Sequence, residues 1–282
     1  MSSEQRPVRL LPVEQSSSED EVRLGVISAA RAMNALGLNR GTAGNVSARW
    51  RDGFLVTPTG MAYDETLPDD IVFVRRDGSW RGARRPSSEW RFHRDIYEAR
   101  EEAGAILHAH SSFATALACL RSGIPPFHYM IARFGGGSIR CADYATFGTQ
   151  ELSRNVVDAL EGRRACLLAN HGMLVFGRGL RHALDLAVEL ETLCEQYWRA
   201  RQIGEPVLLA DAEIGRVLER FADYGQQETS GADSDQGSPG RAERRWRPRP
   251  GADGVPSTGA GGTSPSGQSA EGRDEPRTPR NS

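Results

Sequence analysis

The segment Ala105-Ile106-Leu107-His108-Ala109-His110 places two histidines one residue apart in an otherwise apolar run. Such a run is typical of a buried β-strand, in which successive side chains point to opposite faces of the sheet. His108 and His110 would therefore share one face. Two neighbouring imidazoles in apolar surroundings can bind a divalent metal ion, but a bare His-x-His pair is as often part of a packed core. The segments around this strand decide between the two interpretations.

Two other segments can supply further metal ligands. Ser87-Ser88-Glu89 lies upstream of the histidine strand, and Asn170-His171-Gly172 lies downstream. With His108 and His110 they would provide three imidazole nitrogens and one carboxylate, a ligand set suited to Zn²⁺ or a similar transition-metal ion. We therefore expect a metal centre at the end of this strand, with core packing of the histidines as the alternative.

The basic residues of the chain are all arginine, and the sequence contains no lysine. Schiff-base catalysis needs a lysine amine that can lose its proton, so this chemistry is excluded. An enzyme with this sequence that acts on carbonyl compounds would need another electron sink. A metal ion can fill that role.

Composition narrows the class of protein further. The formal net charge of the 282 residues is −2, which argues against a molecule that binds nucleic acid over its whole surface. No apolar stretch approaches the about 20 residues that a membrane helix needs, and the polar start does not resemble a secretory signal. We therefore expect a cytoplasmic protein that binds neither nucleic acid nor membrane. No Cys-x-x-Cys spacing occurs, and we expect reduced thiols at Cys119, Cys141, Cys166 and Cys194.

The distribution of apolar residues predicts a single domain over residues 18–225. Residues 226–282 are mostly Gly, Ser, Pro, Arg, Asp and Glu, and such a segment cannot bury enough surface to offset its chain entropy. We expect a disordered tail there, whose Arg-rich stretch 241–249 could either contact an anionic partner or be simply solvated. Residues 1–17 are expected to form a flexible extension.

Local signals predict alternating helices and strands. Ser18-Glu19-Asp20-Glu21 has the form of a capping box, and it opens a helix that Gly37 ends. We expect an α/β fold with three layers, α/β/α, in which a mixed, mostly antiparallel central sheet is flanked by helices. The expected strands are 45–50, 54–58, 71–75, 105–110, one near 139, 166–169 and 173–176, and the further helices are about 88–99, one from 111, 180–202 and 211–221.

Three polar segments could together bind a phosphate. Gly41 to Asn45 offers backbone N–H groups from a glycine-rich turn, Thr57 to Gly60 offers a second turn, and Ser87-Ser88 begins a helix with unpaired N–H groups. Each segment alone is better explained by ordinary turn or capping chemistry. Only their convergence in space would make a phosphate site.

Five segments that occur in order resemble the signature of the class II aldolase and adducin-head family. The resemblance runs from about Glu19 to Tyr224 and covers neither terminal extension. It implies a lyase of carbohydrate metabolism that cleaves a ketose 1-phosphate, with L-fuculose 1-phosphate as the expected substrate and dihydroxyacetone phosphate and L-lactaldehyde as products. It also implies a homotetramer. The segments are Pro86–His93, Ile106–His110, His128–Ala132, Tyr144–Thr149 and Leu167–Gly172.

The resemblance assigns roles to individual residues of the metal and phosphate sites. Glu89, His108, His110 and His171 match the ligands of one Zn²⁺, or another divalent transition metal, per subunit. Glu89 also matches the catalytic base. The residues that match the phosphate pocket are Thr42, Asn45, Thr59, Gly60, Ser87 and Ser88.

Two tyrosines also match catalytic positions of the family. Tyr129 matches the acid that protonates the aldehyde-derived oxygen, and the ordinary tyrosine pKa near 10 suits a proton donor. Local packing is the other interpretation of Tyr129. Tyr224 matches a second tyrosine, which is contributed to the site of a neighbouring subunit.

Other activities on the same scaffold remain open at this stage. Related epimerases are expected to carry aspartate at position 89, so Glu89 favours aldol cleavage over epimerisation of a ribulose phosphate. The alternatives are a salvage aldolase for 5-deoxypentulose phosphates, a methylthioribulose-phosphate dehydratase, and a noncatalytic interaction module like the adducin head.

Overall fold

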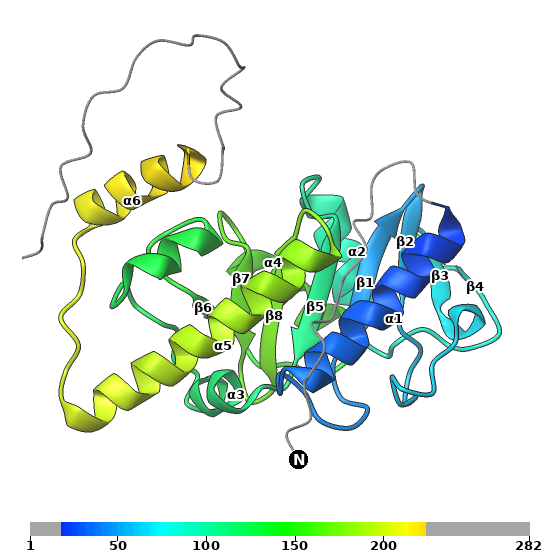
Figure 1. Ribbon diagram of the computed structural model, residues 1–282, viewed down its shortest axis with the longest axis horizontal. Coiled ribbons are helices and arrows are strands. Elements are labelled where there is room, and N and C mark those ends of the chain that lie inside the picture. Colours follow the sequence, from blue (N-terminus) through cyan, green and yellow to red (C-terminus); the bar gives the residue numbers. More distant parts are fainter. Residues whose placement is uncertain (1–17, 224–282) are drawn as a thin grey trace, which may run out of the picture. The chain divides into compact units, whose positions relative to one another are not determined.

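The computed structural model describes residues 18–223, in which eight strands form one sheet (Figure 1). The strand order is β4-β3-β2-β1-β5-β8-β7-β6. Neighbouring strands pair antiparallel except β6 and β7, which are parallel. The strands are β1 (Asn45–Trp50), β2 (Gly53–Val56), β3 (Val72–Arg75), β4 (Trp80–Arg81), β5 (Ala105–Ala109), β6 (Arg140–Ala142), β7 (Ala165–Leu168) and β8 (Gly172–Gly177).

Helices cover both faces of this sheet. One face packs against α1, α3 and α5, of which α1 and α5 lie side by side in Figure 1, and the other packs against α2 and α4. The expected three-layer fold with a mixed, mostly antiparallel sheet is confirmed. The helices are α1 (Glu19–Ala35), α2 (Trp90–Ala99), α3 (Ser112–Cys119), α4 (Gln150–Ala159), α5 (Leu180–Ile203) and α6 (Asp211–Asp223), with the 3₁₀ helices η1 (Pro68–Asp70) and η2 (Tyr129–Phe134).

The histidine strand β5 lies in the middle of the sheet, between β1 and β8. All five of its residues are buried. Ile106 belongs to the core beneath α2 and α4, whereas Leu107 and Ala109 belong to the core beneath α1, α3 and α5. His108 shares the face of Ile106, and its ring meets the ring of Phe92 on α2 at 5.6 Å. The predicted alternation along this strand is confirmed.

Most element boundaries fall within two or three residues of those expected. The capping box of α1 is present, with the Glu21 amide donating to Ser18 Oγ at 3.3 Å and the Ser18 amide donating to Glu21 Oε2 at 2.7 Å. Helix α2 begins at Trp90 instead of residue 88, because Glu89 occupies the cap position with a non-helical backbone.

Helix α4 is absent from the sequence prediction, although the sequence carried its signals. Thr149 caps its first turn, and Leu152, Val156 and Ala159 form the buried stripe at helical spacing. The two-residue strand β4 was also missed, since an exposed edge strand of this length has no hydrophobic pattern.

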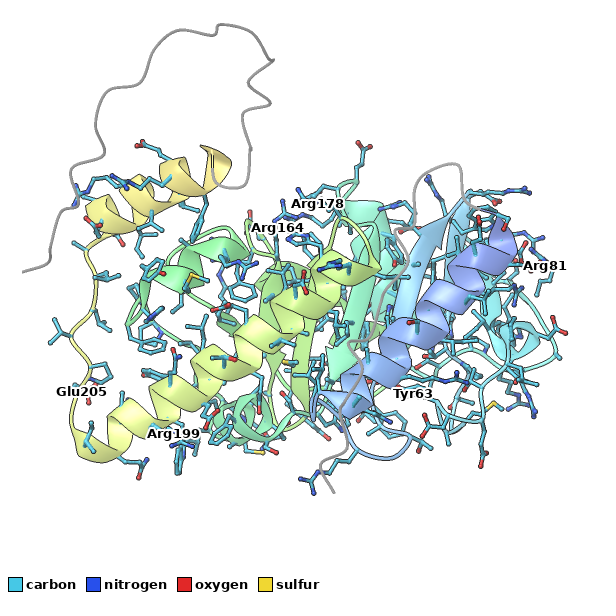
Figure 2. The ribbon with its side chains drawn as sticks, in the orientation of Figure 1. Tyr63, Arg81, Arg164, Arg178, Arg199 and Glu205 are labelled. Carbon is cyan, nitrogen blue, oxygen red and sulfur yellow. The ribbon has the colours of Figure 1, made fainter. Side chains whose placement is uncertain are left out.

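Arginines fasten neighbouring elements by donating to main-chain carbonyl oxygens. Arg23 on α1 donates to the carbonyl groups of Pro68 (2.8 Å) and Ile71. Arg49 on β1 donates to three carbonyl oxygens at the end of α2 and in the loop after it, at 2.8 to 3.0 Å. At the sheet edge, Arg81 reaches Glu19 in the first turn of α1 at 3.0 Å (Figure 2). The planar guanidinium suits such multiple contacts better than an ammonium group.

Predictions about the terminal segments and about Tyr224 concern residues outside the described range 18–223. Within that range, no helix has the length and apolar character needed to cross a membrane. The four cysteines of the chain are free thiols.

Glu191 on α5 caps helix α3, which follows the histidine strand directly. Its carboxylate accepts hydrogen bonds from Ser111 Oγ at 2.6 Å and from the amides of Phe113 and Ala114 at 2.8 and 2.9 Å. These amides belong to the first turn of α3 and would otherwise lack partners. Because Ser111 comes right after His110, the cap also fixes the point at which the chain leaves β5.

We expect Glu191→Ala to lower the free energy of unfolding by about 2 kcal/mol, because it removes a charged cap and leaves helix amides unpaired. Urea denaturation of the metal-free protein measures this. Glu195→Ala, one turn later on α5, breaks only a surface ion pair with Arg199 and should cost no more than about 0.5 kcal/mol. Equal losses in the two variants would contradict the capping role.

Candidate active site

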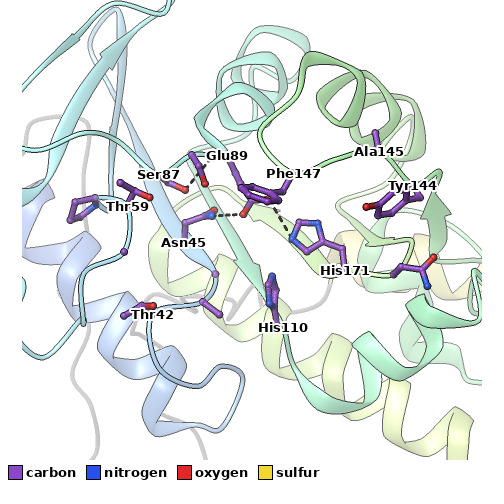
Figure 3. A pocket seen from close by; sticks show the side chains of 16 residues that line it. Thr42, Asn45, Thr59, Ser87, Glu89, His110, Tyr144, Ala145, Phe147 and His171 are labelled. Atoms are coloured by element: carbon purple, nitrogen blue, oxygen red, sulfur yellow. Dashed lines mark hydrogen bonds and ion pairs between the residues drawn. The ribbon is translucent and has the colours of Figure 1, made fainter.

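Three histidines from two separate parts of the sheet converge at one point. His108 and His110 lie at the end of β5, and His171 lies in the turn between β7 and β8. One ring nitrogen from each lies within 4.8 Å of the others, and the ring centroids are 4.7 to 4.9 Å apart. Figure 3 shows His110 and His171 facing the same cavity.

The turn that carries His171 has little conformational freedom. Asn170 has a left-handed backbone with φ of 54°, and its main-chain N–H donates to the Ala118 carbonyl at 3.0 Å. At Gly172 a Cβ atom would lie 2.5 Å from the Ala109 carbonyl oxygen, so only glycine lets this turn come so close to β5. The close approach brings His171 to the other two histidines.

A main-chain hydrogen bond orients the His108 ring. Its Nδ1 lies 2.8 Å from the Met173 carbonyl oxygen, which can only accept, so Nδ1 carries the proton. The Nε2 lone pair of neutral His108 then points into the cluster, 3.1 Å from His110 Nε2. A hydrogen bond of this kind from the far ring nitrogen orients a metal-binding imidazole and fixes its tautomer.

Glu89 completes the cluster from the start of α2. Its side chain is buried, with Oε2 3.3 Å from His108 Nε2 and Oε1 3.4 Å from His171 Nε2. Burial alone would raise the pKa of Glu89, but His108, His171 and a hydrogen bond from Asn45 outweigh it and lower the pKa to about 2. The carboxylate is therefore ionised at neutral pH.

The neighbouring histidines are held neutral. Burial, together with the charge that His108 can carry, lowers the pKa of both His110 and His171 to about 4. In His108 burial acts in the same direction, but the Glu89 carboxylate and the Met173 carbonyl outweigh it and raise the pKa.

These donors fit a divalent transition-metal ion. Glu89 Oε1 is buried and receives no hydrogen bond from the described part of the chain, which is costly for an ionised oxygen. Three imidazoles and one carboxylate within a few ångström supply the nitrogen and oxygen ligands of a typical catalytic zinc-type site. The predicted metal cluster is therefore brought together in space.

The cluster opens into a cavity of about 330 Å³. In Figure 3 the hydroxyl-bearing Thr42, Thr59 and Ser87 lie at one end and Tyr144 at the other, with His110 and His171 between them. Among residues 18–223, no arginine lines this cavity. All six residues predicted for the phosphate pocket line it, namely Thr42, Asn45, Thr59, Gly60, Ser87 and Ser88.

Main-chain pairing holds two of the predicted phosphate segments together. Pro58 and Pro86 form an isolated β-bridge. The Ser87 amide donates to the Thr57 carbonyl at 3.0 Å, and the Thr59 amide donates to the Arg85 carbonyl at 3.2 Å. Because α2 begins two residues after Ser88, its positive N-terminal end faces this segment. The convergence that the sequence left open is therefore present.

Of the two predicted tyrosines, the structure describes only Tyr129, which does not line this cavity. Tyr129 is 49% exposed on η2 and lines a different cavity, formed with α6. Tyr224 lies outside the described residues. Sequence reasoning also missed two exposed aromatic residues, Tyr144 and Phe147, which line the cavity beside the histidine cluster, called the metal cavity below. Both belong to the segment Tyr144–Thr149, whose resemblance could have pointed to them.

Comparison with known proteins identifies the family. Residues 25–198 match the model of the class II aldolase and adducin N-terminal domain. The chain therefore belongs to the class II aldolase and adducin family, and it is an enzyme of that family, a class II aldolase. Class II aldolases use a divalent metal ion, and the three-histidine cluster is a group of side chains that could hold it.

Named relatives agree in class and differ in substrate. A 5-methylthioribulose-1-phosphate/5-deoxyribulose-1-phosphate aldolase of Rhodospirillum rubrum is 56% identical over 204 residues, which are 72% of this chain and 92% of that protein. The L-fuculose phosphate aldolase of Escherichia coli K12 is 48% identical over 201 residues, 71% of this chain and 94% of that protein. A solved L-fuculose 1-phosphate aldolase has a TM-score of 0.71 at 40% identity, covering 74% of this chain and all of that one.

We expect His171→Ala to lower the metal content after dialysis to less than about a tenth of the wild-type value, because one of three converging imidazoles is lost. Elemental analysis of the dialysed protein measures this. His182→Gln is the matched control, since His182 accepts only the Arg178 amide and lies outside the cluster. Undiminished metal in His171→Ala would show that the ion binds elsewhere.

Proposed function

We propose that this class II aldolase cleaves 5-deoxyribulose 1-phosphate and its 5-methylthio analogue, releasing dihydroxyacetone phosphate together with acetaldehyde or (methylthio)acetaldehyde, respectively. The observation that carries this proposal is the 56% identity to an aldolase named for both substrates, which extends over 92% of that protein. A second relative, the 5-deoxy-D-ribulose 1-phosphate aldolase of Bacillus thuringiensis, is 38% identical over 96% of its length.

L-Fuculose 1-phosphate, the substrate expected from the sequence, is the second candidate. It is supported by 48% identity to the Escherichia coli enzyme and by the structural similarity to a solved L-fuculose 1-phosphate aldolase. Cleavage would again give dihydroxyacetone phosphate, now with the three-carbon L-lactaldehyde. The two candidates share the phosphate end of the substrate and differ only in the aldehyde that leaves.

We propose Zn²⁺, one per subunit, as the metal ion, held by His108, His110 and His171 with Glu89 beside it. Zinc binds imidazole nitrogens and carboxylate oxygens readily, and catalytic zinc sites keep a position for substrate. When bound, the ion supplies Lewis-acid stabilisation of the negative charge that develops on the substrate's carbonyl oxygen. Neutral imidazoles leave the positive charge of such an ion undiminished.

Glu89 is the proposed base. In the direction of synthesis its carboxylate removes a proton from the hydroxymethyl carbon of dihydroxyacetone phosphate, and in cleavage it returns that proton to the same carbon. Its low pKa keeps it ionised, and Oε1, which has no hydrogen-bond donor, is the oxygen free to take the proton.

The substrate phosphate is proposed to bind among Thr42, Asn45, Thr59, Gly60, Ser87 and Ser88. Since no arginine lines the cavity and the chain has no lysine, hydroxyl groups, amide groups and the N-terminal end of α2 would have to bind it. Binding at this end fixes the position of the reacting carbon near Glu89.

Tyr129 is proposed to act as the acid that protonates the aldehyde-derived oxygen, in the site of another copy of the chain. It does not line the metal cavity of its own chain, so a direct catalytic role requires a second copy. Tyr224, outside the described residues, is proposed to act in the same way. Both roles require an oligomer, and we propose the homotetramer that the family resemblance suggests.

Side-by-side kinetics test the substrate. With Zn²⁺ bound, we expect kcat/KM for 5-deoxyribulose 1-phosphate to exceed that for L-fuculose 1-phosphate at least about tenfold, equivalent to about 1.4 kcal/mol in transition-state binding. A coupled assay for triose phosphate measures both. The reverse order would favour the second candidate, and no triose phosphate from any of these sugars would contradict both. Glu89→Gln serves as the inactive control, and we expect its activity to be reduced at least about 100-fold.

Mixing inactive variants tests whether sites are built from two copies. Glu89→Gln and Tyr129→Phe should each be inactive alone. Protomers of the two variants, dissociated and reassembled at equal amounts, should regain activity in about a quarter of the sites, because random pairing leaves that share with both residues intact. No recovery on reassembly, with each variant folded and oligomeric, would place Tyr129 outside the site or within its own chain's site.

A further inference from the structure

A continuous chain of buried hydrogen bonds leads from Glu89 into the protein interior. Asn45 Nδ2 donates to Glu89 Oε2 at 3.0 Å, and Asn45 Oδ1 lies 2.6 Å from His93 Nε2. On the other side of the ring, His93 Nδ1 lies 2.7 Å from Ser47 Oγ. Ser47 Oγ in turn lies 2.8 Å from the Tyr97 hydroxyl. All five side chains are buried, and His93 and Ser47 have no exposed surface.

The ionised carboxylate fixes the direction of every bond in this chain. A carboxylate can only accept, so Asn45 must present its NH₂ group to Glu89 and its oxygen to His93. His93 must then carry its proton on Nε2, which leaves Nδ1 as an acceptor for the Ser47 hydroxyl. With its own proton used, Ser47 accepts from Tyr97. Each donor points toward Glu89.

The position of His93 does not require a polar side chain for packing. The ring stacks with Phe54 at 6.1 Å and lies 4.8 Å from the Phe92 ring, so an apolar aromatic residue would fit these surroundings. Burial lowers the pKa of His93 to about 3, so the ring is neutral and carries a single proton. A neutral imidazole in an aromatic pocket is stable only when both ring nitrogens are paired, as they are here.

We propose that His93 is a positioning residue, which holds the Asn45 amide so that its NH₂ group binds Glu89 Oε2 and leaves Oε1 as the oxygen free to react. Without His93, nothing among the described contacts of Asn45 prevents its amide from turning over. The carbonyl would then face the carboxylate and repel it. The catalytic part of this proposal rests on the proposed role of Glu89 as base, whereas the orientation of the amide does not.

The first test determines which ring nitrogen of His93 carries the proton, and it needs neither metal nor substrate. Metal-free, full-length protein labelled with ¹⁵N at its six histidines is studied by solid-state NMR between pH 5 and 8. We expect the ring whose signals disappear in His93→Gln to be a neutral imidazole, protonated on Nε2 alone and unchanged over this range. A ring protonated on Nδ1, or charged at pH 7, would overturn the proposal.

Kinetics of matched variants form the second test. His93→Phe fills the same aromatic space without the hydrogen bonds, and we expect kcat to fall about 10- to 100-fold. His93→Gln keeps an amide donor near the position of Nε2 and should recover most of that loss. Ser153→Ala is the control for a lost buried hydrogen bond, because Ser153 donates to Asp95 at 2.6 Å on the same side of the sheet, away from the site. Its kcat should stay within about twofold of wild type.

The visible absorption of the Co²⁺-loaded protein supplies a readout that is independent of turnover. We expect the spectrum to change in His93→Phe, to return in His93→Gln and to be unaffected in Ser153→Ala. A folded His93→Phe with wild-type kcat and wild-type spectrum would reduce His93 to a packing residue. If the wild type cleaves none of the sugar phosphates, the proposed function fails, while the NMR and Co²⁺ results still decide the orientation of Asn45.

Discussion

The pairing of β5 with β1 on one side and with β8 on the other is the constraint on which the site depends. In this register Asn45 on β1 lies opposite His108, and Met173 on β8 lies opposite Ala109. A slip of one residue would turn His108 to the other face of the sheet, away from α2 and Glu89. The tight turn at Gly172 is part of the same pairing and adds the third histidine. The hydrogen-bond ladder of the sheet thus sets the geometry of the metal site.

The electrostatics of the cavity are unusual for an enzyme that handles a phosphorylated substrate. The described residues that line it include one carboxylate, Glu89, and no arginine. Neutral donors and a bound metal ion must therefore balance the charges of carboxylate and phosphate together. In the protein itself Glu89 is supported by one amide hydrogen bond and two nearby imidazoles. A site with so few fixed positive charges owes its chemistry to the ion that it binds.

Local patterns were enough to predict what depends on one segment at a time. The shared face of His108 and His110 follows from strand alternation, and the start of α1 follows from Ser18 and Glu21. The polar turns near Thr59 and Ser87 were recognised, but their meeting depends on the pairing of Pro58 with Pro86, which no local pattern reveals. His93 shows the same limit. Its position in the helix suggests packing, and only the tertiary structure places it against Asn45.

The use of arginine alone for basic contacts has a consequence for alkaline conditions. Arg23 and Arg49 hold carbonyl groups at the ends of η1 and α2 with several N–H donors each. A lysine in such a place would begin to lose its proton near pH 10, and the contact would weaken with it. A guanidinium group keeps its charge well beyond that pH. Because arginine makes these contacts, the links between the elements do not depend on a lysine amine that loses its proton near pH 10.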